Sequence, residues 1–145
     1  MPDDSSGDKR DEIDKGREFP QFPHNFADLR VSPTVLRVSG EEGWSREIKI
    51  KNFSSCGVLF KVKCTSNHRL AIEDCADILQ PESEIPVKLS KKIKTDAKDK
   101  LFIFYCLVGN QWLDEQQSAY RCWQRVKKQA IPTRCITLNI EEDTK

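Results

Sequence analysis

The chain has 145 residues, enough for one domain with a hydrophobic core and too few for two ordinary domains. Its 24 Lys and Arg residues nearly balance its 23 Asp and Glu residues, so the overall charge does not favour a nucleic-acid partner. The N-terminus lacks the apolar core of a signal peptide, and no run of about 18 apolar residues predicts membrane insertion. We therefore expect a soluble cytoplasmic protein whose six cysteines remain free thiols in a reducing compartment.

Residues 1–28 are predicted to be an acidic, Pro- and Phe-containing tail. The first 18 residues are mostly charged or small, and Ile13 is their only large apolar residue after Met1, so they cannot offset the entropy of ordering. The stretch FPQFPHNF (19–26) contains two prolines that oppose regular structure. We interpret it as a tether whose phenylalanines could lie across a core edge, with a short recognition motif as the alternative.

From residue 29 to residue 141, short apolar runs alternate with turn residues, which is typical of an all-β sandwich. Because side chains alternate along a strand, Ile48 and Ile50 are expected to face the core, and Lys49 and Lys51 the solvent. The next strand has two faces: Val58, Phe60, Val62 and Cys64 inside, and Leu59, Lys61, Lys63 and Thr65 outside.

The second half of the domain continues this pattern with one interruption. Residues 85–89 alternate as a strand, and residues 101–108 are apolar on both faces, which predicts a central strand covered by more than water on at least one side. Residues 111–130 have helix-forming residues and apolar side chains at three-to-four spacing, which predicts a short helical connection before the last strand. Residues 142–145 are expected to be a C-terminal tail.

Five short motifs, in their order and spacing, resemble the major sperm protein (MSP) domain. They are KIKN (49–52), KCT (63–65), RLAI (69–72), CADILQP (75–81) and DKLFIFY (99–105). The resemblance spans about residues 29–141 and implies an immunoglobulin-like, seven-stranded β-sandwich. Asp74 and Cys64 depart from the family pattern, which usually has proline and threonine at these positions.

The resemblance implies a non-enzymatic interaction protein in one of two settings. Nematode MSPs dimerise and assemble into the filaments that drive crawling sperm, whereas VAP-type domains bind short acidic FFAT peptides through a basic groove.

Glu73 stands where VAP-type domains usually have Arg and sperm proteins have Asp, and we find no coiled coil or membrane anchor. These features favour a cytoskeletal component or modulator of MSP filaments in sperm motility, located in the cytoplasm and the sperm pseudopod. Its partners would be MSP filaments or a second copy of the chain, as in a homodimer. The alternative is a VAP-like adaptor that binds acidic peptides.

Lysines on one sheet face form the candidate partner-binding site. By resemblance, four residues match positions that line the acidic-peptide groove of VAP-type domains: Lys63, Thr65, Lys100 and Phe102. Lys61 shares the outward face with Lys63, and residues 88–100 supply six lysines. Lysines attract acidic segments, and an exposed aromatic ring offers the apolar side chains of such a segment a contact surface. The alternative without a binding function is a set of solvated lysines that protect an edge strand from aggregation. Nucleic acid is a third reading, disfavoured by the neighbouring acidic residues.

The second face of the 101–108 strand carries Phe102, Phe104 and Val108. If neither the 111–130 connection nor the N-terminal phenylalanines cover this face, it is a candidate protein interface. The alternative is that these large apolar side chains are buried in the core.

Four residues are the candidate ligands for a metal site: Cys56, Cys64, His68 and Cys75. The gaps between them are eight, four and seven residues, whereas zinc ligands usually come in pairs two to four residues apart. The sequence also lacks a glycine-rich phosphate loop and a nucleophile with a nearby base. We therefore expect no metal site, no cofactor and no catalytic residue.

Overall fold

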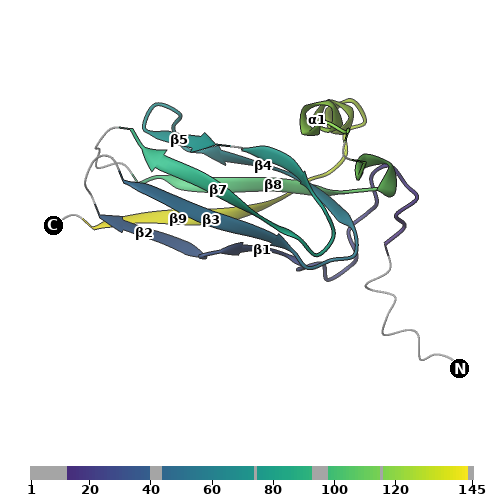
Figure 1. Ribbon diagram of the computed structural model, residues 1–145, viewed down its shortest axis with the longest axis horizontal. Coiled ribbons are helices and arrows are strands. Elements are labelled where there is room, and N and C mark those ends of the chain that lie inside the picture. Colours follow the sequence, from purple (N-terminus) through teal and green to yellow (C-terminus); the bar gives the residue numbers. More distant parts are fainter. Residues whose placement is uncertain (1–12, 40–43, 74, 93–97, 115, 144–145) are drawn as a thin grey trace, which may run out of the picture.

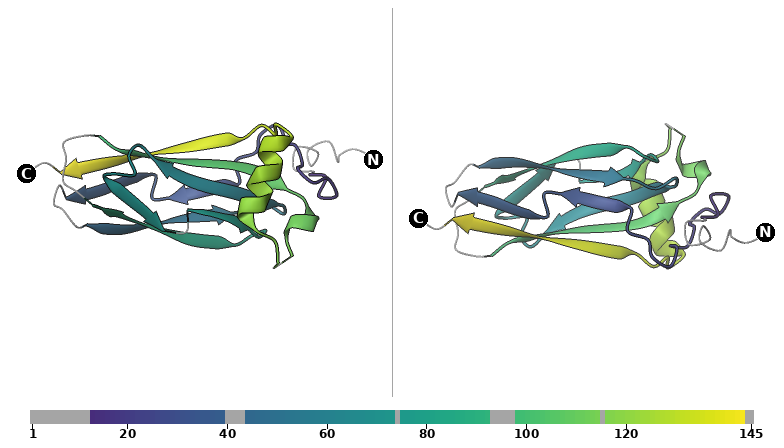
Figure 2. Two further views of the ribbon diagram at one scale, coloured as in Figure 1. Left: turned by 90° about the horizontal axis from the view of Figure 1, so that it is seen from above. Right: turned by 90° about the horizontal axis from the view of Figure 1, so that it is seen from below.

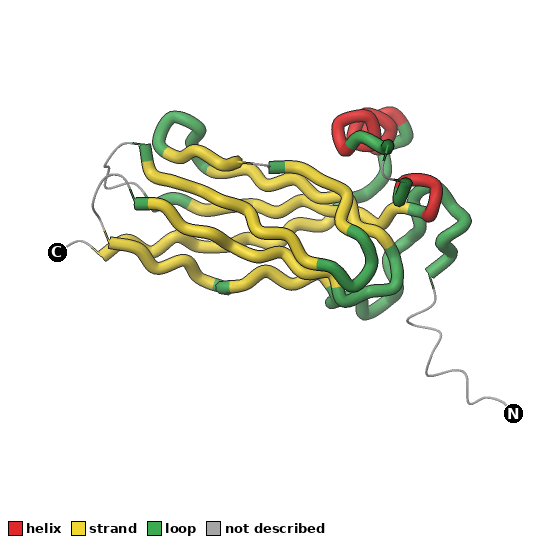
Figure 3. Tube along the Cα trace, viewed as in Figure 1, coloured by secondary structure: helices red, strands yellow, loops and turns green. Residues whose placement is uncertain are grey.

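The computed structural model describes residues 13–39, 44–73, 75–92, 98–114 and 116–143, and two β-sheets packed face to face form the body of this part (Figure 1). Figure 3 shows that helical structure lies at one end of the sandwich. Lys94, residue 74 and the first 12 residues of the predicted tail lie outside the described residues. Within them, no helix is long and apolar enough to cross a bilayer.

The two sheets hold four and five strands. The four-stranded sheet has the order β1 (Leu29–Ser32), β3 (Ser45–Asn52), β7 (Glu84–Lys91), β5 (Leu70–Glu73). The five-stranded sheet has the order β2 (Val35–Ser39), β9 (Arg134–Asp143), β8 (Lys100–Val108), β4 (Gly57–Cys64), β6 (Ala76–Leu79). Neighbouring strands run antiparallel, except that β2 and β9 are parallel.

The expected seven runs correspond to these nine strands because two runs switch sheets. The first run supplies β1 to one sheet and, after Pro33, β2 to the other. The run between β4 and β7 likewise supplies β5 to the four-stranded sheet and β6 to the five-stranded sheet. The all-β, immunoglobulin-like sandwich with a short helix before its last strand is therefore confirmed.

The main core lies between the sheets and follows the predicted alternation. Ile48 and Ile50 are fully buried on β3, and Val58, Phe60 and Val62 are buried on β4. Cys64, at the end of β4, is only partly buried against this core. The sequence therefore assigned the inward face correctly, with burial weakening toward the strand end.

A second core covers one end of the outer face of the five-stranded sheet, where helix α1 (Ala119–Lys128) lies across the strands (Figure 2). Leu59 was expected to face solvent, but it is fully buried because α1 covers its face. The same cover explains why β8 is apolar on both faces: Cys106 and Val108 pack against the helix side. Trp123 of α1 is buried there and donates from Nε1 to the carbonyl oxygen of Phe60 at 3.4 Å.

Local sequence explains where α1 begins and ends. The Ser118 hydroxyl accepts a hydrogen bond from the Arg121 backbone N–H, which caps the first turn. Three apolar side chains at helical spacing, Cys122, Trp123 and Val126, turn to the sheet. Ala130 follows with a φ of 54°, a left-handed conformation that ends helices.

Residues 13–28, which we call the N-terminal strap, pack against the same end of the sandwich instead of hanging free. Phe19 is buried in the second core, with its ring 6.4 Å from that of Trp112. The backbone N–H of Gly109 donates to the Glu18 carbonyl at 2.9 Å, and a Cβ at Gly109 would lie 1.8 Å from the Arg17 carbonyl oxygen. Only glycine permits this approach. The domain boundary at residue 29 stays a prediction.

Candidate functional site

The five residues predicted to bind a partner lie on neighbouring strands of the five-stranded sheet. Lys63 of β4 is directly opposite Phe102 of β8, with Lys61 two residues along β4 on the same face. Beyond the end of β4, the Thr65 N–H donates to the Lys100 carbonyl at 3.1 Å. The structure thus brings all five together, and we call this set the basic groove.

Aromatic side chains that sequence reasoning did not assign to the site border the basic groove. Phe104 is opposite Lys61, and its ring centroid lies 6.4 Å from that of Phe102 and 5.9 Å from the Lys63 ammonium. Trp123 reaches the groove from α1, and the Lys61 ammonium lies 4.4 Å from its ring centroid. Phe102 and Phe104 remain half-buried, so α1 only partly covers the face that was considered as an interface. A signal for Phe104 was present in its alternation with Phe102, whereas the position of Trp123 depends on tertiary packing.

Lys61, Lys63 and Lys100 give the groove positive charge. Burial, and then repulsion from Lys63 and Lys127, lowers the pKa of the Lys61 ammonium. Within the described ranges, no carboxylate forms an ion pair with Lys61, Lys63 or Lys100. An electropositive surface beside aromatic rings is suited to an anionic segment with an apolar side chain.

The lysine-rich stretch 88–100 does not form one patch. Lys88 is on β7 in the other sheet, opposite Glu47 of β3 and Glu73 of β5. Lys91 is buried and lies in an ion pair with Asp99. Among the described lysines of this stretch, Lys100 lies in the basic groove, where its carbonyl accepts from the Thr65 N–H.

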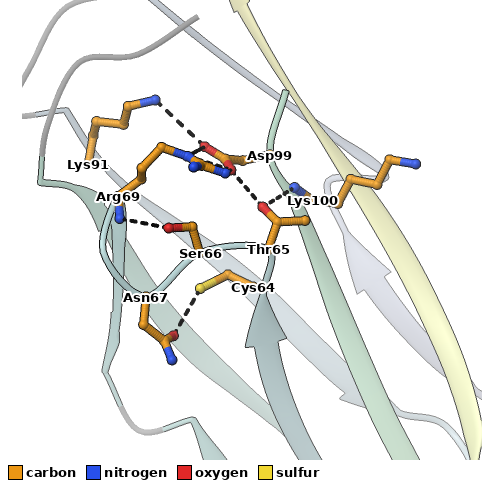
Figure 4. A network of polar contacts seen from close by, with 8 residues as sticks. All are labelled: Cys64, Thr65, Ser66, Asn67, Arg69, Lys91, Asp99 and Lys100. Carbon is orange, nitrogen blue, oxygen red and sulfur yellow. Dashed lines mark hydrogen bonds and ion pairs between the residues drawn. The ribbon is translucent and has the colours of Figure 1, made fainter. Parts of the chain in front are cut away.

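A partly buried polar network holds the end of the groove that contains Thr65 and Lys100 (Figure 4). The Arg69 guanidinium donates to Asp99 Oδ1 at 2.6 Å through Nη2, and the Thr65 hydroxyl donates to the same oxygen at 2.6 Å. The Thr65 hydroxyl in turn accepts from the Lys100 backbone N–H at 3.3 Å. The Lys91 ammonium lies 3.8 Å from Asp99 Oδ2. The network therefore joins the turn after β4 to the start of β8.

Asp99 is the centre of this network, with a side chain only 1% exposed. Burial alone raises the pKa of its carboxyl, but hydrogen bonds from Arg69 and Thr65 outweigh burial and hold the pKa below its ordinary value. Asp99 thus stays ionised at neutral pH. Its role was not foreseen, although both Asp99 and Arg69 occur in the motifs that carried the family resemblance.

Comparison with known proteins now decides the family. The model of the MSP (Major sperm protein) domain matches residues 28–128, well over half of the chain. The chain belongs to the MSP domain family. This MSP domain continues through β9, which completes the five-stranded sheet beyond the matched residues. MSP domains are non-enzymatic β-sandwiches that mediate protein interactions.

Solved structures agree with this fold. SSP-19, an MSP-domain-like protein of Caenorhabditis elegans, is 18% identical with a TM-score of 0.66. WR4, an MSP family member of C. elegans, is 15% identical with a TM-score of 0.67. Each alignment covers 81% of this chain and 100% of the other. No curated protein sequence matches the chain.

The cysteines of this MSP domain do not converge with His68. Cys56 directly precedes β4 and Cys64 is its last residue. At the usual rise per residue of a strand, the two cysteines are about 25 Å apart. Cys64 Sγ instead donates to Asn67 Oδ1 at 3.3 Å, and Cys56 Sγ to the Val108 carbonyl at 3.2 Å. In the part of the chain that the structure describes, no three His, Cys, Asp or Glu residues are grouped as metal ligands would be.

Proposed function

We propose that this MSP domain is a non-enzymatic interaction module that binds an acidic segment of a protein partner in the basic groove. The observation that carries the proposal is the row of Lys61, Lys63 and Lys100 beside half-buried Phe102, on one sheet face. Lysines steer the acidic segment to the groove, and the phenylalanine ring offers its apolar side chains a contact. The Asp99 network supports this use because it fixes the position of Thr65 and Lys100 before binding.

Calorimetric titration with a 12-residue peptide of Asp, Glu and two Phe residues tests this function. The double variant Lys63→Asp with Lys100→Asp is expected to lose detectable binding, and wild-type affinity is expected to fall with salt. The matched control is Lys49→Asp with Lys51→Asp, which changes the charge equally on the outer face of the four-stranded sheet. An amide version of the peptide, with Asn and Gln for Asp and Glu, should not bind. Equal loss of binding in both double variants would mean that only net charge matters, and no wild-type binding at low salt would end the proposal.

A second candidate function rests on the family match. The resemblance implies kinship with nematode MSPs that assemble into filaments, so the chain, as a member of this family, is proposed as a cytoskeletal component or modulator of MSP filaments that act in sperm motility. On this proposal the protein would lie in the sperm cytoplasm and pseudopod, and sheet faces and edge strands would make the contacts. β1 and β5 are the edge strands of the four-stranded sheet, and edge strands suit such self-association or filament binding.

Sedimentation separates the two functions. If the filament proposal holds, the protein forms dimers or larger species as its concentration rises, or it co-sediments with assembled MSP filaments. A protein that is monomeric at all concentrations and stays in the supernatant with filaments contradicts it. The peptide titration is unaffected by that outcome, so the two candidates fail independently.

A further inference from the structure

A hollow of about 270 Å³ lies between α1 and the five-stranded sheet, next to the basic groove. Figure 2 shows the helix crossing the strands at this end of the sandwich. The walls of the hollow are apolar and partly aromatic: Phe104, Trp123, Val126, Ala130 and Ile131. Thr133 and three lysines, Lys61, Lys63 and Lys127, complete its lining. The hollow thus combines an apolar interior with several positive charges.

The three lysines line the same hollow, and two of them lie against aromatic rings. Lys61 lies over the Trp123 ring and Lys63 over the Phe104 ring, at 4.4 and 5.9 Å from the ring centroids. Repulsion from Lys63 and Lys127 adds to burial in lowering the pKa of Lys61, which agrees with their closeness. Among the residues that the structure describes, no carboxylate makes an ion pair with them. An anion placed here would relieve this repulsion and accept charge-assisted hydrogen bonds.

We propose that this hollow binds an aromatic group that carries a phosphate or a carboxylate. The ring packs against the walls formed by Phe104, Trp123 and Ile131, where edge and offset contacts between rings are favourable. The anion lies at the three lysines, and Lys61 exchanges its contact with the Trp123 ring for a contact with the anion.

This inference goes beyond the proposed function because the hollow depends on α1, whereas the basic groove does not require Lys127. The two sites share Lys61 and Lys63 but differ at their far ends, Lys100 for the groove and Lys127 for the hollow. Variants at those ends therefore distinguish failure of one proposal from failure of the other.

Titration with phenyl phosphate, followed by two-dimensional NMR, tests the proposal. We expect saturable shifts of the Trp123 indole N–H and of the backbone N–H groups of Phe104 and Ile131. Inorganic phosphate supplies the anion alone and benzyl alcohol the ring alone, so each should bind at least about tenfold more weakly. Phenyl phosphate that binds no better than inorganic phosphate, or that shifts residues elsewhere, overturns the proposal.

A pair of neighbouring variants on α1 provides the matched control. Lys127→Glu should weaken phenyl phosphate binding at least about fivefold, because Lys127 lines the hollow. Lys128→Glu makes the same charge change at an exposed residue outside the lining and should leave the affinity within about twofold. Equal effects of the two variants, with both shown by circular dichroism to be folded, would contradict the site.

Two further measurements locate the ligand and distinguish the hollow from the basic groove. Lys100→Asp should leave phenyl phosphate binding unchanged, and a loss there would assign the ligand to the groove and overturn the hollow. A phosphotyrosine peptide that competes with phenyl phosphate would identify a protein side chain as the source. Binding of the free aryl phosphate without competition by the peptide would identify a small molecule instead, and both outcomes support the aromatic anion site.

Discussion

Asp99→Asn is the substitution that most sharply tests the network behind the basic groove. The carboxyl side chain is 1% exposed, and it is shared by Arg69 Nη2 at 2.6 Å and Lys91 Nζ at 3.8 Å. Removing one partner from a buried ion pair costs about 3–5 kcal/mol. Because the Arg69 side chain is 25% exposed and can turn toward water, we expect the lower end, about 3 kcal/mol of unfolding free energy. For a chain of this size that loss lowers the melting temperature by about 10 °C.

The pH dependence of the Asp99→Asn effect has a defined sign. The pKa of Asp99 in the folded state is below its ordinary value, so its ionised form stabilises the fold above about pH 4. That stabilisation is lost as the pH falls through the folded-state pKa, because the protonated carboxyl then resembles the amide. The difference between wild type and variant should therefore be full at pH 7 and shrink in acid.

Urea unfolding, followed by far-ultraviolet circular dichroism at pH 7 and at lower pH, measures this difference. Asp77→Asn is the matched control, since Asp77 is exposed on β6, and it should change the unfolding free energy by less than about 0.5 kcal/mol. An Asp99→Asn effect below about 1 kcal/mol at pH 7, or one that does not shrink in acid, would refute the reasoning.

Three other predictions concern the second core. Leu59→Ala should cost about 2–5 kcal/mol in the same urea assay, since Leu59 is fully buried beneath α1, and a loss below about 1 kcal/mol would show that α1 does not pack there. Glu18→Gln should speed amide hydrogen exchange in α1, because hydrogen bonds from Arg125 hold the helix to the strap and lower the pKa of Glu18 to about 2. That effect should persist from pH 7 to about pH 4 and fade only in stronger acid as the folded-state carboxylate becomes protonated, so a loss of the effect near pH 5 would contradict it. Alkylation at pH 8, followed by mass spectrometry, should label exposed Cys75 and Cys135 but not Cys106, whose pKa burial raises to about 12; early labelling of Cys106 would disprove its burial.

Strand alternation predicted the main core because the two-residue period of a strand is visible in a single segment. Ile48 and Ile50 are buried as the pattern required, and the helix before the last strand falls within residues 111–130. Leu59 shows where this reasoning stops. The next residues on its face of the strand are Lys61 and Lys63, which predict an exposed face, whereas its burial comes from a helix that begins 60 residues later. The second apolar face of residues 101–108 indicated a cover but did not identify α1.

The candidate site was predictable only in part for a related reason. Lys63, Thr65 and Phe102 come together through the register of β4 and β8, which the family resemblance implied. The contributions of Trp123 and Asp99 depend on side chains that meet across 30 or more residues of sequence, and no local pattern predicts such contacts. The phenylalanines of the N-terminal strap were expected at a core edge, and Phe19, Phe22 and Phe26 pack there, but the polar composition of the preceding residues gave no sign of the contacts made by Glu18.

The central claim, that the protein binds an acidic partner segment on the outer face of the five-stranded sheet, is tested most directly by an NMR footprint. The acidic, Phe-containing peptide is titrated into isotope-labelled protein, and backbone shifts are assigned to the two sheet faces. The account predicts the largest shifts at Lys61, Lys63, Thr65, Lys100 and Phe102. Shifts confined to the outer face of the four-stranded sheet, or no saturable shifts at low salt, would contradict it.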